Sequence, residues 1–320
     1  MPAILQESAL FLSDVMKGLT GNPKYLPSKY FYDAKGNQLF RMIMAMPEYY
    51  LTRAEHEIFK FQSRRIINKA VTHQPVQVIE LGAGDGWKTK LLLKELLQQN
   101  IQFEYFPIDI SHNVLEALTE SIEREFQGRV PVYGIEGEYF EALSSPVLQK
   151  DVPKLFLFLG SNIGNFQLRE ASDFVCRISQ MMMEGDKLLV GFDLKKNPHT
   201  ILSAYSDKEG ITKEFNLNLL KRINRELDAN FDVTKFTHLA VYDPLIGAAK
   251  SYLVSLCAQE VYIGAAEQKL YFKAHEAIFT EISQKFDEMT INEFADKNEL
   301  RIVETFTDSR NMFADVLFEK

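Results

Sequence analysis

The chain has 320 residues, 46% of them hydrophobic, and a formal net charge of −8 at pH 7, which predicts a globular protein with one large or two closely associated cores. The acidic balance argues against a nucleic-acid-binding surface, which needs concentrated Lys and Arg, and no apolar run approaches the ~20 residues of a membrane span. The two cysteines, Cys176 and Cys257, lack C-x-x-C spacing, so we expect no disulfide framework, no metal site and a cytoplasmic location.

Residues 1–26 are predicted to form an amphipathic helix. Glu7, Asp14 and Lys17 lie inside the apolar pattern of this segment, whereas the apolar core of a signal peptide excludes charge. We therefore expect this segment to be part of the folded protein.

The segment 76–97 predicts a strand, a glycine-rich turn and a helix. Glycines at 82, 84 and 86 follow the apolar strand 76–81, and the leucines between 92 and 97 form one helical face. Such glycines let the backbone approach a ribose or adenine, and the helix N-terminus offers free N–H groups. A dinucleotide fingerprint would need glycine at 87, where the chain has Trp87. The turn therefore favours S-adenosylmethionine over a nicotinamide dinucleotide, with a purely structural turn as the alternative.

The next predicted strand, 103–111, carries a carboxylate near its end. Asp109 lies about 20 residues beyond the glycine turn, where a carboxylate can accept both ribose hydroxyls. The alternative is that Asp109 or Ser111 caps the following helix, 113–126.

A third strand is predicted over 130–136. It leads into Glu138 and Tyr139, an acidic and aromatic pair that can contact an adenine through its amine and by stacking. As an isolated pair, these two residues are equally compatible with ordinary surface.

Further strands complete a sheet. The continuous apolar run 154–159 is typical of a parallel strand covered on both faces, and the polar segment 160–165 follows at its carboxyl end, where open α/β sheets bind ligands. Another strand is predicted over 187–193, and 301–306 with 313–318 predict an antiparallel pair at one edge. The expected fold class is α/β, with a Rossmann-like, mostly parallel sheet and an antiparallel C-terminal edge.

The stretch after residue 195 predicts a second, inserted α+β domain. Its segments 239–242, 251–256 and 269–272 alternate like half-buried antiparallel strands. In the alternating segment 279–283, Glu281 and Ser283 share one face, and together they can bind a ring or amine that carries N–H donors. The alternative is the polar outer face of a strand.

Spaced motifs along nearly the whole chain resemble those of the S-adenosylmethionine-dependent, histidine-specific methyltransferases of ergothioneine biosynthesis. The motifs are Leu26–Asp33, Met46–Glu55, the glycine turn, Phe158–Asn165, Ala204–Tyr205, Asn224–Leu227 and Thr280–Phe286. The resemblance implies an enzyme that methylates the α-amino nitrogen of L-histidine three times, giving hercynine. Fungal relatives act on a prenylated tryptophan, so the alternatives are a methyltransferase for another amino acid or small amine, or a cofactor-binding protein without turnover.

The resemblance also implies which residues bind each ligand. The cofactor contacts it implies are Tyr32, Gly82, Gly84, Lys88, Asp109, Glu138 and Tyr139. The substrate contacts it implies are Tyr50, Asn165 and Tyr205 at the amino-acid end and Glu281 and Ser283 at the imidazole. Tyr32 and Asn165 are the candidates to position the reacting amine, as catalytic residues.

One position departs from the family pattern in a way that bears on the substrate. Ser251 stands where the histidine enzymes have a methionine that packs against the ring, so we expect a roomier or more polar side-chain pocket. Residues 55–195 with 286–320 are predicted to form the S-adenosylmethionine-binding domain, and 1–54 with 196–285 the amino-acid-substrate domain. We expect a monomer that acts on a small-molecule amino acid.

Overall fold

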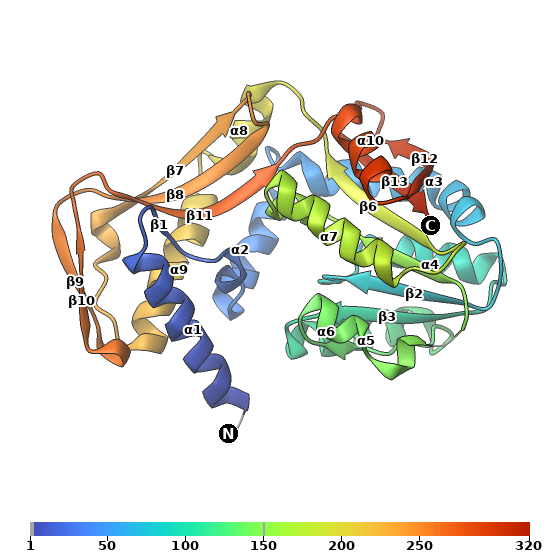
Figure 1. Ribbon diagram of the computed structural model, residues 1–320, viewed down its shortest axis with the longest axis horizontal. Coiled ribbons are helices and arrows are strands. Elements are labelled where there is room, and N and C mark those ends of the chain that lie inside the picture. The colour runs from blue at the N-terminus through green and yellow to red at the C-terminus, as the bar shows by residue number, and fades with distance from the viewer. Residues whose placement is uncertain (1–2, 150) are drawn as a thin grey trace. The chain divides into compact units, whose positions relative to one another are not determined.

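The computed structural model describes residues 3–149 and 151–320, and the chain divides into two compact units (Figure 1). Unit 1 comprises residues 1–50 and 196–283, and unit 2 comprises residues 51–195 and 284–320. Within the described ranges, every helix is too short or too polar to cross a membrane.

Unit 2 is built on one twisted sheet with the strand order β12-β13-β6-β5-β2-β3-β4. The strands are β2 (Val76–Leu81), β3 (Phe103–Asp109), β4 (Ile135–Glu136), β5 (Lys154–Phe158), β6 (Lys187–Asp193), β12 (Arg301–Thr307) and β13 (Phe313–Glu319). Neighbours from β6 to β4 run parallel, whereas β13 runs antiparallel to both β6 and β12. This confirms the predicted α/β sheet with an antiparallel C-terminal edge.

Helices cover both faces of this sheet, as Figure 1 shows. They are α3 (Tyr50–Ala70), α4 (Thr89–Gln98), α5 (His112–Phe126), α6 (Tyr139–Leu143), α7 (Leu168–Met181) and α10 (Glu288–Lys297). Alternate residues of β2 enter different cores: Ile79 joins the core that contains α7 and α10, and Val78 joins the core that contains α3, α4 and α5. Every residue of β2, β5 and β6 is buried, which explains the continuous apolar run of β5.

The third predicted strand, 130–136, is wrong in its extent. Only Ile135 and Glu136 form β4, and Val132 makes an isolated bridge to Tyr105. Pro131 has no backbone N–H to donate, and Gly134 contributes no side chain to pack, so the pairing is interrupted at this edge of the sheet.

Unit 1 combines a mixed sheet, in the order β1-β11-β8-β7, with a separate pairing of β9 and β10. Its strands are β1 (Lys24–Tyr25), β7 (Phe236–Asp243), β8 (Ala248–Ser255), β9 (Gln259–Ile263), β10 (Gln268–Phe272) and β11 (Ala277–Gln284). Its helices are α1 (Ala3–Thr20), α2 (Ala34–Ala45), α8 (Pro198–Tyr205) and α9 (Ile211–Leu227). The predicted strands of the insertion are present, and the one at 269–272 pairs antiparallel with β9.

The chain leaves unit 2 after Lys195 and returns to it at Gln284, and these two points are joined inside unit 2. Leu194 and Phe286 form a parallel bridge, and the Phe286 N–H donates to the Asp193 carbonyl at 2.9 Å. The Lys285 ammonium lies 2.8 Å from the Asp193 carboxylate, and both side chains are fully buried. A buried ion pair thus connects the segment that leaves unit 2 to the segment that returns to it.

Candidate functional site

The glycine turn follows β2 and is shaped for a close ligand. Gly82, Gly84 and Gly86 have φ values of +71°, +55° and +62°, in the left-handed region that glycine adopts without strain. A Cβ built at Gly82 would lie 2.9 Å from the Tyr139 hydroxyl, whereas a Cβ at Gly84 would meet nothing within 4 Å. The backbone at Gly84 is therefore open to an approaching nucleoside, as S-adenosylmethionine requires.

Glu80, the acidic residue near the end of β2, holds this turn to its neighbours. It is buried, and its carboxylate accepts hydrogen bonds from Thr89 Oγ1 at 2.6 Å and from the Tyr105 hydroxyl. Burial raises the pKa of Glu80 to about 7. Because its two carboxylate oxygens accept from residues of α4 and β3, Glu80 links these elements to β2 and stabilises the strand-turn-helix unit.

Asp109 ends β3 beside the turn. Its Oδ2 accepts from the Gly84 N–H at 3.3 Å and its Oδ1 from the Ser111 N–H at 3.0 Å. Ser111 occupies the N-cap position of α5 without a capping side-chain hydrogen bond. Burial raises the pKa of Asp109 above its ordinary value. The carboxylate therefore lies against the glycine turn, as a residue that accepts ribose hydroxyls must.

Glu138 and Tyr139 differ in their solvent exposure and in their contacts. Glu138 is exposed at the N-cap of α6, whereas Tyr139 is half-buried, with its ring edge-on to Phe158 and Phe174 at centroid distances of 5.8 Å. Burial raises the pKa of Tyr139, so its hydroxyl stays protonated. The hydroxyl faces Gly82, which brings Tyr139 to the glycine turn.

Lys88 precedes α4 and is held by a residue that the sequence did not single out. Its ammonium pairs with the Glu55 carboxylate of α3, and the other oxygen of Glu55 accepts from the Gly160 N–H at 2.6 Å. The neighbouring Trp87 is half exposed and stacks on His56 of α3, with ring centroids 4.1 Å apart. Residues from α3 therefore fix both Lys88 and Trp87.

Asn165 lies in the segment that follows β5. It ends the 3-10 helix η3 (Asn162–Asn165) and is exposed, so its amide is accessible. Within unit 2 the structure thus gathers Gly82, Gly84, Asp109 and Tyr139 at the carboxyl ends of the strands, with Lys88 at the start of α4.

In unit 1 two predicted substrate residues are in direct contact. The Tyr205 hydroxyl of α8 donates to Ser283 Oγ of β11 at 2.7 Å. Tyr50 is buried, and its hydroxyl accepts from Lys196 Nζ at 3.0 Å. Lys196 is itself half-buried, with its ammonium 4.3 Å from the Tyr50 ring centroid.

Ser251 has a partner that the sequence did not predict. It is 2% exposed on β8, and its hydroxyl lies 3.1 Å from His238 Nε2 on β7. Burial lowers the pKa of His238 to about 4, so the imidazole is neutral at physiological pH. Thr280 of β11 donates to the Ser251 carbonyl at 3.0 Å, which ties Ser251 to the strand that carries Glu281 and Ser283. The surroundings of Ser251 are polar, whereas a roomier or more polar substrate pocket stays a prediction.

Tyr32 lies in a short link between the 3-10 helix η1 (Ser28–Phe31) and α2. It is 37% exposed, and its ring is edge-on to Phe40 and Phe215 at centroid distances of 5.6 Å and 6.0 Å. Aromatic packing therefore restrains the Tyr32 ring, although the residue is partly exposed.

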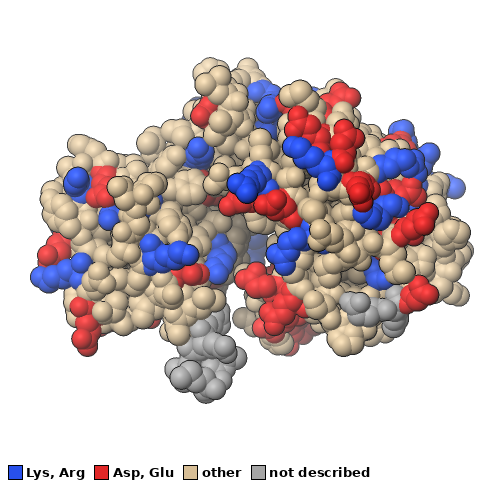
Figure 2. All heavy atoms as spheres, in the orientation of Figure 1, with Lys and Arg blue, Asp and Glu red and all other residues tan. Residues whose placement is uncertain are grey.

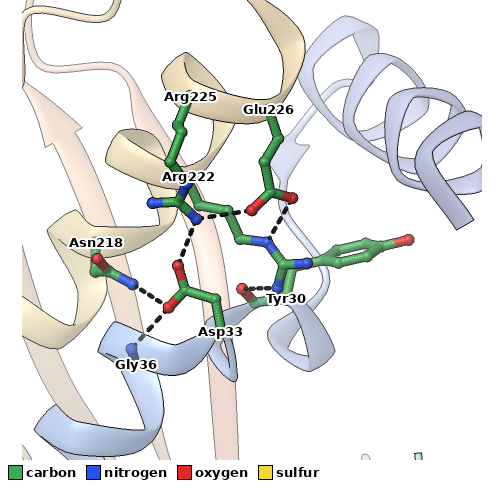
Figure 3. Close-up of polar contacts among 7 residues, drawn as sticks. All are labelled: Tyr30, Asp33, Gly36, Asn218, Arg222, Arg225 and Glu226. Carbon is green, nitrogen blue, oxygen red and sulfur yellow. Dashed lines mark hydrogen bonds and ion pairs between the residues drawn. The ribbon is translucent and has the colours of Figure 1, made fainter. Parts of the chain in front are cut away.

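The residues on either side of Tyr32 are anchored to α9 (Figure 3). Asp33 accepts from the Gly36 N–H at 2.7 Å, from Asn218 at 2.8 Å and from Arg225 at 2.7 Å, while Arg222 donates to the Tyr30 carbonyl at 3.1 Å. Burial alone would raise the pKa of Asp33, but these hydrogen bonds lower it below its ordinary value. Asp33 is therefore a structural anchor for Tyr32 as well as the N-cap of α2.

Among residues 3–149 and 151–320, no cluster of three or more His, Cys, Asp or Glu side chains could hold a metal ion.

Comparison with known proteins gives the family. The model of the family described as histidine-specific, SAM-dependent methyltransferase matches residues 11–320. The histidine N-alpha-methyltransferase of Mycobacterium tuberculosis is 37% identical over 273 residues, which are 85% of this chain and 83% of the relative. That of Mycolicibacterium smegmatis is 35% identical over 94% of this chain and 92% of the relative. Ergothioneine biosynthesis protein 1 of Schizosaccharomyces pombe is 30% identical over 88% of this chain and 37% of the relative. The chain therefore belongs to the family of S-adenosylmethionine-dependent, histidine-specific methyltransferases.

Proposed function

We propose that the chain methylates the α-amino nitrogen of L-histidine with S-adenosylmethionine as the methyl donor, and that trimethylhistidine, hercynine, is the final product. The observation that carries this proposal is the similarity to two histidine N-alpha-methyltransferases over most of the chain. A different amino acid or amine as acceptor is the second candidate, and the polar surroundings of Ser251 favour it.

The cofactor is assigned to unit 2. When bound, S-adenosylmethionine supplies an electrophilic methyl group on a sulfonium. Asp109 would accept the ribose hydroxyls, Gly82 and Gly84 would admit the nucleoside, and Glu138 with Tyr139 would contact the adenine. Lys88 would bind the carboxylate of the methionine part, which is the one anionic group of this ligand.

The acceptor is assigned to tyrosines, an amide and the polar pair of β11. Tyr50, Asn165 and Tyr205 would hold the amino-acid end, and Glu281 and Ser283 would bind the imidazole. The Tyr205–Ser283 hydrogen bond supports this assignment because it joins a residue of each group. Tyr32, whose ring is restrained by packing, would position the amine together with Asn165.

Methyl transfer of this kind depends on orientation and on exclusion of water. The lone pair of the amine must approach in line with the breaking bond, so no covalent nucleophile from the chain is needed. In model peptides an α-amine has a reference pKa of about 7.7–8.0, so at neutral pH the acceptor amine must lose a proton before it can attack. The tyrosine faces would accommodate the cationic product, with about 0.5–2 kcal/mol per contact.

The test of this proposal is an assay with isotopically labelled S-adenosylmethionine and each of the twenty protein amino acids, with products identified by mass. Histidine is expected to be the best acceptor and to gain three methyl groups on its α-nitrogen. Preference for another amino acid would overturn the choice of histidine and leave the family assignment intact.

Replacing Asp109 with Ala is expected to weaken binding of S-adenosylhomocysteine, the demethylated product, by about 1–3 kcal/mol, because hydrogen bonds to a charged group are lost. Isothermal titration calorimetry measures this directly. Glu136→Ala is the matched control, since Glu136 is exposed and paired with Asp109 in the β3–β4 register. Undiminished affinity in Asp109→Ala would show that the carboxylate does not contact the ligand.

Surface charge supports a small-molecule acceptor over a nucleic acid. Lys and Arg side chains are interspersed with Asp and Glu on the face shown in Figure 2, in keeping with the net charge of −8. That the chain acts as a monomer in the cytoplasm stays a prediction from the sequence.

A further inference from the structure

Glu55 of α3 occupies a position that the binding assignments above do not explain. It is 1% exposed, and both carboxylate oxygens are engaged: Oε2 by the Lys88 ammonium and Oε1 by the Gly160 N–H at 2.6 Å. A buried carboxylate is costly unless it is paired and hydrogen-bonded, and Glu55 is both. Its contacts connect α3, the start of α4 and the carboxyl end of β5.

The sheet beneath is shaped to receive Glu55. A Cβ built at Gly191 of β6 would lie only 2.6 Å from Glu55 Oε1, so a side chain at 191 would displace the carboxylate. A Cβ at Gly160 would lie 3.5 Å from Lys88 Nζ, which places the ammonium directly over the backbone at the end of β5. Glycines therefore accommodate both members of the pair.

Asp315 of β13 is the other ionisable group near Lys88. It is fully buried, pairs in register with Gly191, and neither carboxylate oxygen has a hydrogen-bond partner among the described residues. Burial raises the pKa of Asp315 well above its ordinary value. Among the described residues, Glu55 is the carboxylate in direct contact with the Lys88 ammonium.

We propose that Glu55 is a positioning residue for the cofactor site: it fixes the Lys88 ammonium at the carboxyl end of β5, where Lys88 binds the carboxylate of the methionine part of the cofactor. An ammonium has three N–H donors, and within residues 3–149 and 151–320 Glu55 is its hydrogen-bonding partner, so two donors are left for a ligand. Preorganisation of this kind strengthens binding, because the lysine side chain is already ordered before the ligand binds and loses little further conformational entropy. The proposal rests on the assignment of Lys88 to the cofactor.

Two ligands separate positioning from general structural damage. S-adenosylhomocysteine carries the amino-acid end, whereas 5′-methylthioadenosine keeps the nucleoside and lacks that end. In Glu55→Gln, calorimetry is expected to show a loss of about 10-fold to 100-fold in affinity for S-adenosylhomocysteine, the scale of a hydrogen bond to a charged group, with 5′-methylthioadenosine unaffected. Equal losses for both ligands, or no loss for either, would overturn the proposal.

Matched variants control for the location of the change. Glu57→Gln lies on the same helix, where Glu57 accepts from the Ser309 N–H at 2.9 Å, and it should bind both ligands like the parent. Asp315→Asn keeps the shape of a buried side chain that makes no hydrogen bond to Lys88 among the described residues, and it should do the same. If the parent binds neither ligand, the cofactor assignment itself has failed, which is a different outcome from a failure of Glu55.

A double variant keeps the test valid if Glu55→Gln does not fold. Glu55→Gln combined with Lys88→Met leaves neither charge buried without its partner. If Glu55 acts through Lys88, then Lys88→Met and the double variant should bind S-adenosylhomocysteine with the same reduced affinity, because the two changes remove one interaction. Additive losses would show that Glu55 contributes independently of Lys88.

The pH dependence of binding is a further test, because it would not change in Glu55→Gln if Glu55 had a purely structural role. Burial lowers the pKa of Lys88 from its ordinary value, so affinity for S-adenosylhomocysteine should be full at low pH and fall as pH rises through that pKa. Loss of the Glu55 charge disfavours the ammonium, so the fall should begin at lower pH in Glu55→Gln. The ligand's own amine titrates equally in both titrations. Superimposable profiles would contradict the proposal.

Discussion

Replacing Lys285 with Met is expected to lower the free energy of unfolding by about 3–5 kcal/mol, the largest stability effect that we predict for a single substitution in this chain. The Lys285 ammonium and the Asp193 carboxylate are 2.8 Å apart and fully buried. Removing the ammonium leaves Asp193 without this cation in a medium that solvates charge poorly. Urea unfolding followed by circular dichroism measures the change from the shift in midpoint.

A matched surface pair shows whether burial is the cause. Lys297 and Glu293 lie one turn apart on α10 at 3.4 Å, with side chains 61% and 53% exposed. Lys297→Met should change the free energy of unfolding by no more than about 0.5 kcal/mol, as for other exposed helical pairs. A loss below about 1 kcal/mol for Lys285→Met would show that the buried pair is energetically unimportant.

Replacing Glu281 with Ala is expected to remove most of the preference for histidine over tryptophan, by about 100-fold or more in the ratio of the two kcat/KM values. A site that hydrogen-bonds a polar ring selects that ring strongly, because a competitor leaves buried polar groups unpaired. Glu281 lies half-buried on β11, two residues before Ser283, which accepts the Tyr205 hydroxyl. Initial rates with the two amino acids give the ratio.

Two comparison variants define what Glu281 contributes. Ser251→Met changes packing on the neighbouring strand without removing Glu281, so it should retain the preference and lower KM for histidine. Glu260→Ala alters an exposed carboxylate of β9 that pairs with Lys269, and it should leave the ratio unchanged. An unchanged ratio in Glu281→Ala would assign imidazole recognition to other residues.

Much of the sheet was predictable from sequence because its signals are local. Strands β2, β5 and β6 are buried on both faces, and in β5 this burial appears in the sequence as a continuous apolar run after Lys154. The turn after β2 carries glycines at positive φ. Few backbone conformations require such angles, so closely spaced glycines after a strand indicate a turn. At the edge, β4 was overestimated because its apolar residues gave the expected pattern while Pro131 and Gly134 limited the pairing.

The ionic contacts could not be predicted, because they join residues that lie far apart in the sequence and follow no shared periodic pattern. Glu55 pairs with Lys88 across 33 positions and with Gly160 across 105. His238 likewise meets Ser251 only because β7 and β8 align in one register. A motif can mark such residues as members of a family, but the contact that gives each its role comes from the fold.

The bridge between Leu194 and Phe286 has a consequence for how this protein can change over evolutionary time. A segment whose two ends meet at neighbouring points can be lengthened, shortened or exchanged while the remaining chain keeps its path. Residues 196–283 leave and rejoin the strand order of unit 2 at such a point. Family members with different acceptors are therefore expected to concentrate their differences in this segment, with the parallel sheet inherited unaltered.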